Sequence, residues 1–86
     1  MALHMRLMVN EQQIGYLIAR RLSPNRPTGN DICQYDWTIN INGITRSNLE
    51  EEPLSHRFGD GAWALVAKIV NAAGLDAPPK QFVEVK

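Results

Sequence analysis

The segment LSHRFGDG, residues 54–61, holds the residue types best suited to binding a ligand. A histidine and an arginine precede two glycines that flank an aspartate, at the point where a strand should end and a helix begin. Free backbone N–H groups at a helix N-terminus attract anions, so this junction could hold a phosphate or a carboxylate. In the alternative interpretation, the glycines only make a turn, the aspartate caps the helix and the basic side chains are solvated. The candidate ligand-binding residues are His56, Arg57, Asp60, Gly61 and Trp63.

Cys33 is the single cysteine of the chain. One thiol cannot form an internal disulfide, which favours a reducing compartment, and we expect a cytoplasmic protein. Cys33 could act as a nucleophile or redox group if His56 came near it in space. A reactive thiol needs an electropositive and partly open setting, whereas Cys33 lies on the apolar face of a predicted strand. A small buried hydrophobic residue is therefore the favoured interpretation.

No other spacing is typical of a catalytic or metal site. His4, Cys33, His56 and Asp60 are the conceivable metal ligands, and no pair has the close spacing of a zinc site. The sequence lacks nucleophile-elbow and zinc-protease motifs, and GDG lacks the GK[ST] ending of a P-loop. We therefore expect no catalytic residue, no metal and no cofactor, and an enzyme is the least favoured class.

Arg20, Arg21 and Arg26 define a candidate nucleic-acid surface. They fall near one end of a predicted hairpin, with Tyr16 and Tyr35 nearby, and basic residues interleaved with aromatic rings suit a nucleic-acid strand. Against this, nine basic residues balance nine acidic ones, so the formal net charge is zero. Scattered, solvated arginines are the more ordinary interpretation.

The 86 residues, 44% of them hydrophobic, fit one small globular domain over 1–86. Residues 1–4 and 76–86 are candidates for loose termini. No apolar run approaches the roughly 20 residues of a membrane span, and the N-terminus lacks a signal-peptide segment. We expect no membrane partner.

The clearest strand, CQYDWTINI, covers residues 33–41. Its alternation predicts one apolar face, formed by Cys33, Tyr35, Trp37, Ile39 and Ile41. Asn42-Gly43 tolerates the positive φ angles of a type I′ hairpin, so residues 44–47 should return antiparallel. An interruption over 48–53 and a resumed strand over 54–58 should follow.

Two strands are predicted upstream. Residues 3–9 alternate, and 10–13 would form the turn. Residues 14–22 fit either a helix or a strand with Ile14, Tyr16 and Ile18 on one face; β-branched and aromatic residues favour the strand. Residues 81–85 are either an edge strand or a tail.

Residues 60–73 are predicted to form the main helix, with Asp60 as its cap and Gly74 as its stop. The apolar stripe along this helix must pack against an apolar surface, and the apolar face of the 33–41 strand provides one. The predicted fold is α+β, an antiparallel sheet of three to five strands packed against one C-terminal helix. The stripe consists of Ala62, Leu65, Val66, Ile69, Val70 and Ala73.

HRFGDGAWALVAKIV, with YDWTINING before it, resembles small stand-alone bacterial proteins of unknown function such as those carried in mobile gene cassettes. The likeness covers the second half of the chain. It implies a compact α+β protein, often oligomeric, and it transfers no functional residue.

The leading functional interpretation is a small non-catalytic interaction protein that self-associates, with a dimer favoured. One helix covers only part of a sheet face, and open strand edges invite pairing. The first alternative is a small-molecule or anion binder at residues 56–63. The second is a nucleic-acid binder acting through the three arginines.

Overall fold

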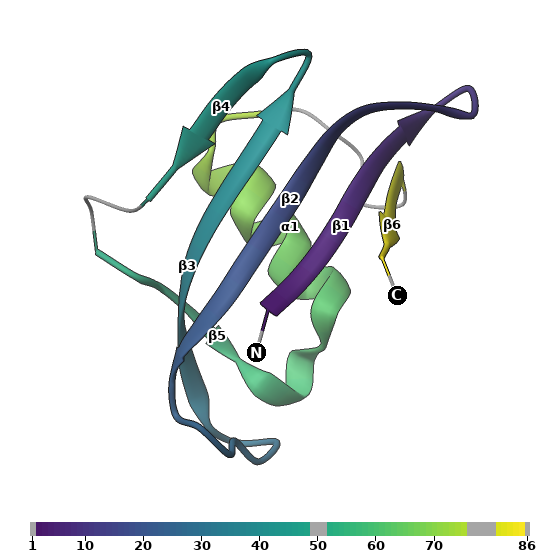
Figure 1. Ribbon diagram of the computed structural model, residues 1–86. Coiled ribbons are helices and arrows are strands. Elements are labelled where there is room, and N and C mark those ends of the chain that lie inside the picture. The colour runs from purple at the N-terminus through teal and green to yellow at the C-terminus, as the bar shows by residue number, and fades with distance from the viewer. Residues whose placement is uncertain (1, 49–51, 76–80, 86) are drawn as a thin grey trace.

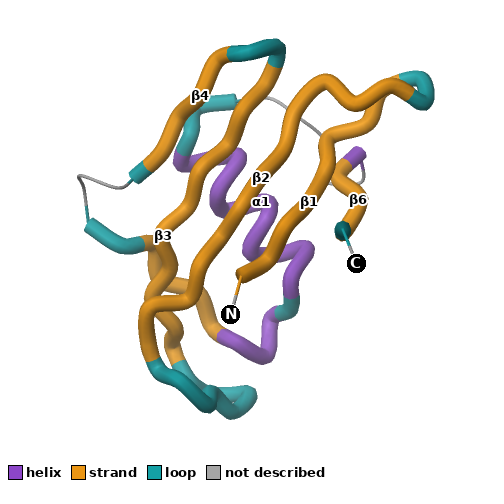
Figure 2. Tube along the Cα trace, in the orientation of Figure 1, coloured by secondary structure: helices purple, strands orange, loops and turns teal. Residues whose placement is uncertain are grey.

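The computed structural model describes residues 2–48, 52–75 and 81–85. It confirms the predicted α+β class: an antiparallel sheet is covered on one face by a single helix, with six strands in place of the three to five expected (Figures 1 and 2). The elements in chain order are β1 (Ala2–Val9), β2 (Gln12–Ser23), β3 (Ile32–Ile41), β4 (Ile44–Ser47), β5 (Leu54–Arg57), the 3-10 helix η1 (Phe58–Asp60), α1 (Ala62–Ala72) and β6 (Phe82–Glu84).

The strand order is β4-β3-β2-β1-β6, and β5 pairs with the first half of β3. The first four strands are joined in sequence as hairpins, and the Asn42-Gly43 turn has the predicted positive φ angles of 53° and 83°. Strand β6, which follows α1 in the sequence, pairs with β1 and forms the edge of the sheet opposite to β4 (Figure 1). Within the predicted loose termini, Ala2–His4 pair with β2 and Phe82–Glu84 pair with β1, so these residues are strand; residues 1, 76–80 and 86 lie outside the described part.

Asn48 bridges the interruption between β4 and β5. The β3 residues Asp36 and Trp37 have no register partner in β4 or β5. The Asn48 side chain takes the place of that partner: its Oδ1 accepts the Trp37 backbone N–H at 2.7 Å, and its Nδ2 donates to the Tyr35 carbonyl at 3.2 Å. The interruption predicted over 48–53 thus begins with a side chain that completes the β3 ladder; residues 49–51 lie outside the described part.

The core lies between α1 and the inner face of the sheet. Tyr35, Trp37 and Ile39 are buried there, as the alternation predicted, and Phe82 of β6 closes the far side. Helix α1 ends at Ala72, and Gly74 has a φ of 71°, consistent with its predicted role as the stop. The helix buries Leu65, Val66, Ile69 and Val70.

Strand β2 corrects one prediction about faces. Residues 14–22 are strand, as favoured, but Ile14 does not share a face with Tyr16 and Ile18. The register of β1 against β2 shifts between Leu7 and Met8, so Ile14 sits in a bulge and packs on the core, whereas Ile18 is 37% exposed. The turn before β2 is also shorter than the predicted 10–13, because β2 already begins at Gln12.

No helix in the described ranges has the length and apolar character needed to cross a membrane.

Candidate ligand-binding site

The chain passes from β5 to α1 through a tight turn that rests on the loop after β2. The Gly59 N–H donates to the Gly29 carbonyl at 3.0 Å. A Cβ at Gly59 would lie 2.6 Å from that oxygen, so only glycine allows this approach. Gly61 then starts α1 with a φ of 87°, a value that favours glycine. This connection therefore places the N-terminal end of α1 at the edge of the sheet's inner face.

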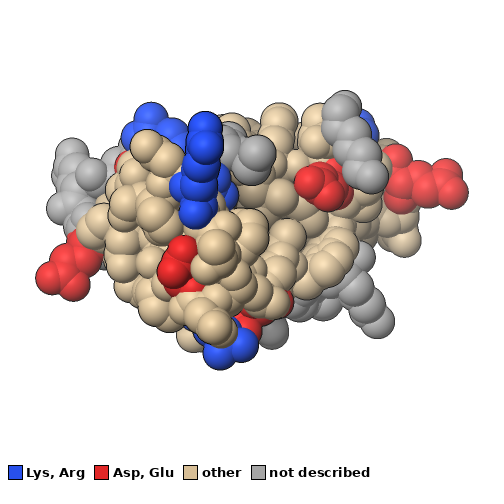
Figure 3. Space-filling model, turned by 90° about the horizontal axis from the view of Figure 1, so that it is seen from below, with Lys and Arg blue, Asp and Glu red and all other residues tan. Residues whose placement is uncertain are grey.

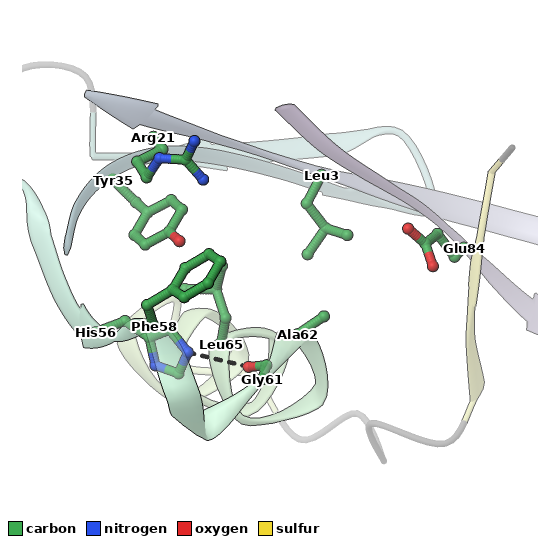
Figure 4. A pocket seen from close by; sticks show the side chains of 9 residues that line it. All are labelled: Leu3, Arg21, Tyr35, His56, Phe58, Gly61, Ala62, Leu65 and Glu84. Atoms are coloured by element: carbon green, nitrogen blue, oxygen red, sulfur yellow. Dashed lines mark hydrogen bonds between the residues drawn. The ribbon is translucent and has the colours of Figure 1, made fainter. Parts of the chain in front are cut away.

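A cavity of about 260 Å³ opens between this first turn and the sheet (Figure 4). Its apolar wall consists of Leu3, Phe58, Ala62 and Leu65. Its polar groups come from Arg21, Tyr35, His56 and Glu84, with the backbone of Gly61 beside them. A small, mainly apolar cavity with a few convergent polar groups is the usual form of a small-molecule site.

His56 forms the floor of this cavity and is 2% exposed. Its Nε2 lies 3.0 Å from the Gly61 carbonyl oxygen, so Nε2 carries the proton and donates it. Nδ1 is buried and has no hydrogen-bond partner among the described residues. Burial lowers the pKa of His56 below its usual value, so the imidazole is neutral at pH 7. His56 therefore contributes an uncharged surface to the cavity and a hydrogen bond to the start of α1, and it adds no positive charge.

Tyr35 lies on the same side of the cavity, edge-on to His56 with 6.2 Å between ring centroids. Burial raises the pKa of its phenol, and the neighbouring Cys33 adds to this; the Arg21 guanidinium acts in the opposite direction. The hydroxyl therefore keeps its proton at neutral pH and is available as a hydrogen-bond donor.

Arg21 supplies the positive charge. It lies opposite Tyr35 in the β2–β3 register. Its Nε donates to the Pro24 carbonyl at 3.0 Å, and its guanidinium carbon stands 5.8 Å from the centre of the Phe58 ring. These contacts fix the side chain while leaving some of its five N–H groups without a protein acceptor among the described residues.

The structure brings together only part of the predicted ligand site. His56 and Gly61 line the cavity, whereas Arg57 and Asp60 form an exposed ion pair at 3.4 Å. The predicted cap at Asp60 is wrong: Gly61 is the N-cap and no side chain caps α1, because Asp60 belongs to η1. Trp63 is 51% exposed and lies outside the cavity lining.

The three arginines predicted as a nucleic-acid surface do not form one patch. Successive strand residues point to opposite faces, so Arg20 reaches the outer face, where it pairs with Asp36 at 3.1 Å, while Arg21 reaches the cavity. Arg26 is exposed in the loop. The end of the molecule seen in Figure 3 carries positive and negative side chains interspersed over a mostly uncharged surface.

Two further features are separate from the cavity. A hollow of about 300 Å³ on the outer face is lined by Ile18, Arg20, Asp36, Trp37 and Thr38. Its arginine is already paired with Asp36, so this hollow offers no free positive charge to an anion. Cys33 is fully buried opposite His56 in the β3–β5 register, as the favoured interpretation expected.

In the described ranges no three histidine, cysteine, aspartate or glutamate side chains gather as metal ligands. The sequence did not reveal that Arg21, Tyr35, Leu3 and Glu84 line one cavity. The one available signal was the hairpin register that sets Arg21 opposite Tyr35.

The chain matches no protein-family model, no curated protein and no solved structure.

Proposed function

We propose that the protein is a small non-catalytic binding protein whose ligand is a small organic anion with an apolar body. The ligand occupies the cavity between the inner face of the sheet and the first turn of α1. One observation carries the proposal: Tyr35 and His56, the two described groups with shifted pKa values, line a single cavity that also contains the Arg21 guanidinium. Groups with perturbed pKa values that share a concave site with a charged side chain are more frequent at functional sites than elsewhere.

The chemistry of the wall supports an anion such as a carboxylate. Arg21 offers N–H donors in a planar array, and the protonated Tyr35 hydroxyl offers another. Phe58 and Leu65 provide an apolar surface for the rest of the ligand. The neutral His56 adds no second charge, which favours a singly charged carboxylate over a phosphate.

Titration calorimetry with phenylacetate tests this proposal, with neighbouring residues as matched controls. Arg21→Gln should abolish the binding heat, whereas Arg20→Gln, which removes the same charge from the outer face, should retain it. Ala62→Phe should fill the cavity and block binding, whereas Ala67→Phe, on the exposed side of α1, should not. Equal binding by all four variants would contradict the proposal.

Self-association through β4 is a second proposal, and it rests on a specific observation. All four β4 residues are exposed, and Ile44 is 65% exposed at an edge of the sheet. A second copy could pair antiparallel with this edge and form a two-fold dimer. Sedimentation equilibrium should then show dimers that Thr45→Pro dissociates. A strict monomer at high micromolar concentration would exclude this second role.

A further inference from the structure

The cavity has opposite charges at its two ends. Arg21 and Tyr35 stand at one end and Glu84 at the other, with Leu3 between them (Figure 4). The sheet order explains this separation: Arg21 is on β2, Glu84 is on β6, and β1 runs between them. Two strand spacings separate β2 from β6 by about 10 Å across the sheet. Along the strands the register offsets the two residues by four residues of β1, about 13 Å, so their backbones are about 16 Å apart.

The middle of the cavity is apolar. Leu3 projects from β1 between the charged ends, and Ala62 and Leu65 face it from α1 (Figure 4). A ligand that reaches both ends must therefore cross a stretch with no polar side chain to contact.

The two charged side chains differ in how firmly the protein holds them. Arg21 is held by two backbone carbonyls and by Phe58, so it is preorganised. Glu84 is exposed and makes no salt bridge with any described residue. A carboxylate at Glu84 repels a second anion and attracts a cation, so it discriminates between ligands by what they carry at the end remote from Arg21.

We propose that the cavity selects extended zwitterions, with a carboxylate at Arg21 and Tyr35, an aliphatic body along Leu3 and Leu65, and an ammonium at Glu84. The ligand class is therefore ω-amino carboxylates and molecules of similar charge separation. This inference rests on the proposed function, because it requires that the cavity binds carboxylates at all.

Three probes of equal carbon number separate these requirements. Caproate carries only the carboxylate, ε-aminocaproate adds an ammonium at the far end, and norleucine, an isomer of ε-aminocaproate, carries the ammonium beside the carboxylate. Because Glu84 is exposed, we expect ε-aminocaproate to bind about two- to fivefold more tightly than caproate, and norleucine to show no such gain.

Glu84→Gln provides the residue-specific test. It should remove the advantage of ε-aminocaproate and leave caproate bound at least as tightly as before, while Val83→Gln, at the exposed neighbouring position, should change neither. If caproate binds through Arg21 but ε-aminocaproate gains nothing, the zwitterion inference is overturned and the proposed function stands. If no probe binds and phenylacetate also fails, both are overturned.

Discussion

The Nε2 atom of His56 and the carbonyl oxygen of Gly61 lie 3.0 Å apart, and this contact joins β5 to the start of α1. It fixes the tautomer of the ring and leaves the buried Nδ1 as a lone-pair acceptor. A second proton on His56 would therefore bury a charge and an N–H donor with no acceptor among the described residues.

This contact predicts an acid-sensitive fold. Burial lowers the pKa of His56 in the folded state, so below about pH 6.5 the unfolded chain binds the proton more tightly. The contribution of His56 to the free energy of unfolding should be constant above that pH and should fall, by up to about 1.4 kcal/mol per pH unit, as the pH decreases further. Urea unfolding at a series of pH values measures it.

The two histidines provide the control for this pH dependence. His56→Gln should lower the free energy of unfolding at pH 7 and should reduce its decrease at acid pH. His4→Gln, at an exposed position, should leave that decrease unchanged. If the full decrease at acid pH persists in His56→Gln, it arises from groups other than His56.

A second prediction concerns Asn48. Asn48→Ala leaves the buried Trp37 N–H and the Tyr35 carbonyl without their side-chain partner, so the free energy of unfolding should fall by about 2–3 kcal/mol. Asn40→Ala, which loses two exposed bonds, one donated to the Thr45 hydroxyl and one accepted from the Gly43 N–H, should cost less than about 1 kcal/mol. Equal losses would mean that Asn48 does not bridge β4 and β5 in solution.

A third prediction concerns Gly15. A Cβ there would stand 1.9 Å from the Asn40 carbonyl oxygen, a backbone atom of the adjacent strand. Gly15→Ala should therefore cost about 3 kcal/mol or more, and thermal unfolding would report it. Gly29→Ala is the matched control, since its Cβ would meet no atom within 4 Å, and it should change stability by less than about 0.5 kcal/mol. A Gly15→Ala protein as stable as Gly29→Ala would contradict the packing of β2 on β3.

Local patterns were sufficient for most of the fold. The alternation of Tyr35, Trp37 and Ile39 and the helical spacing of Leu65 to Val70 each identify one apolar face, and two apolar faces in a small chain must pack together. The Asn42-Gly43 turn then fixes the β3–β4 register. The faces of β2 were misassigned because the bulge at Ile14 depends on pairing with β1, which no local pattern encodes.

The site was less predictable for the same physical reason. His56 and Gly61 are close in sequence, so their contact could be anticipated. Arg21 and Glu84 reach one cavity only because β6 returns to the edge of β1, and that pairing depends on the whole topology. Asp60 looked like a cap from its position, but the extra turn of η1 carries it toward Arg57.

Amide NMR shifts mapped during a phenylacetate titration would show whether the inner cavity binds small carboxylates. We predict saturable shifts centred on the inner cavity, at Arg21, Phe58, Gly61, Ala62 and Leu65. Shifts centred instead on the outer hollow at Ile18, Arg20 and Thr38, or no saturable shift anywhere, would contradict it.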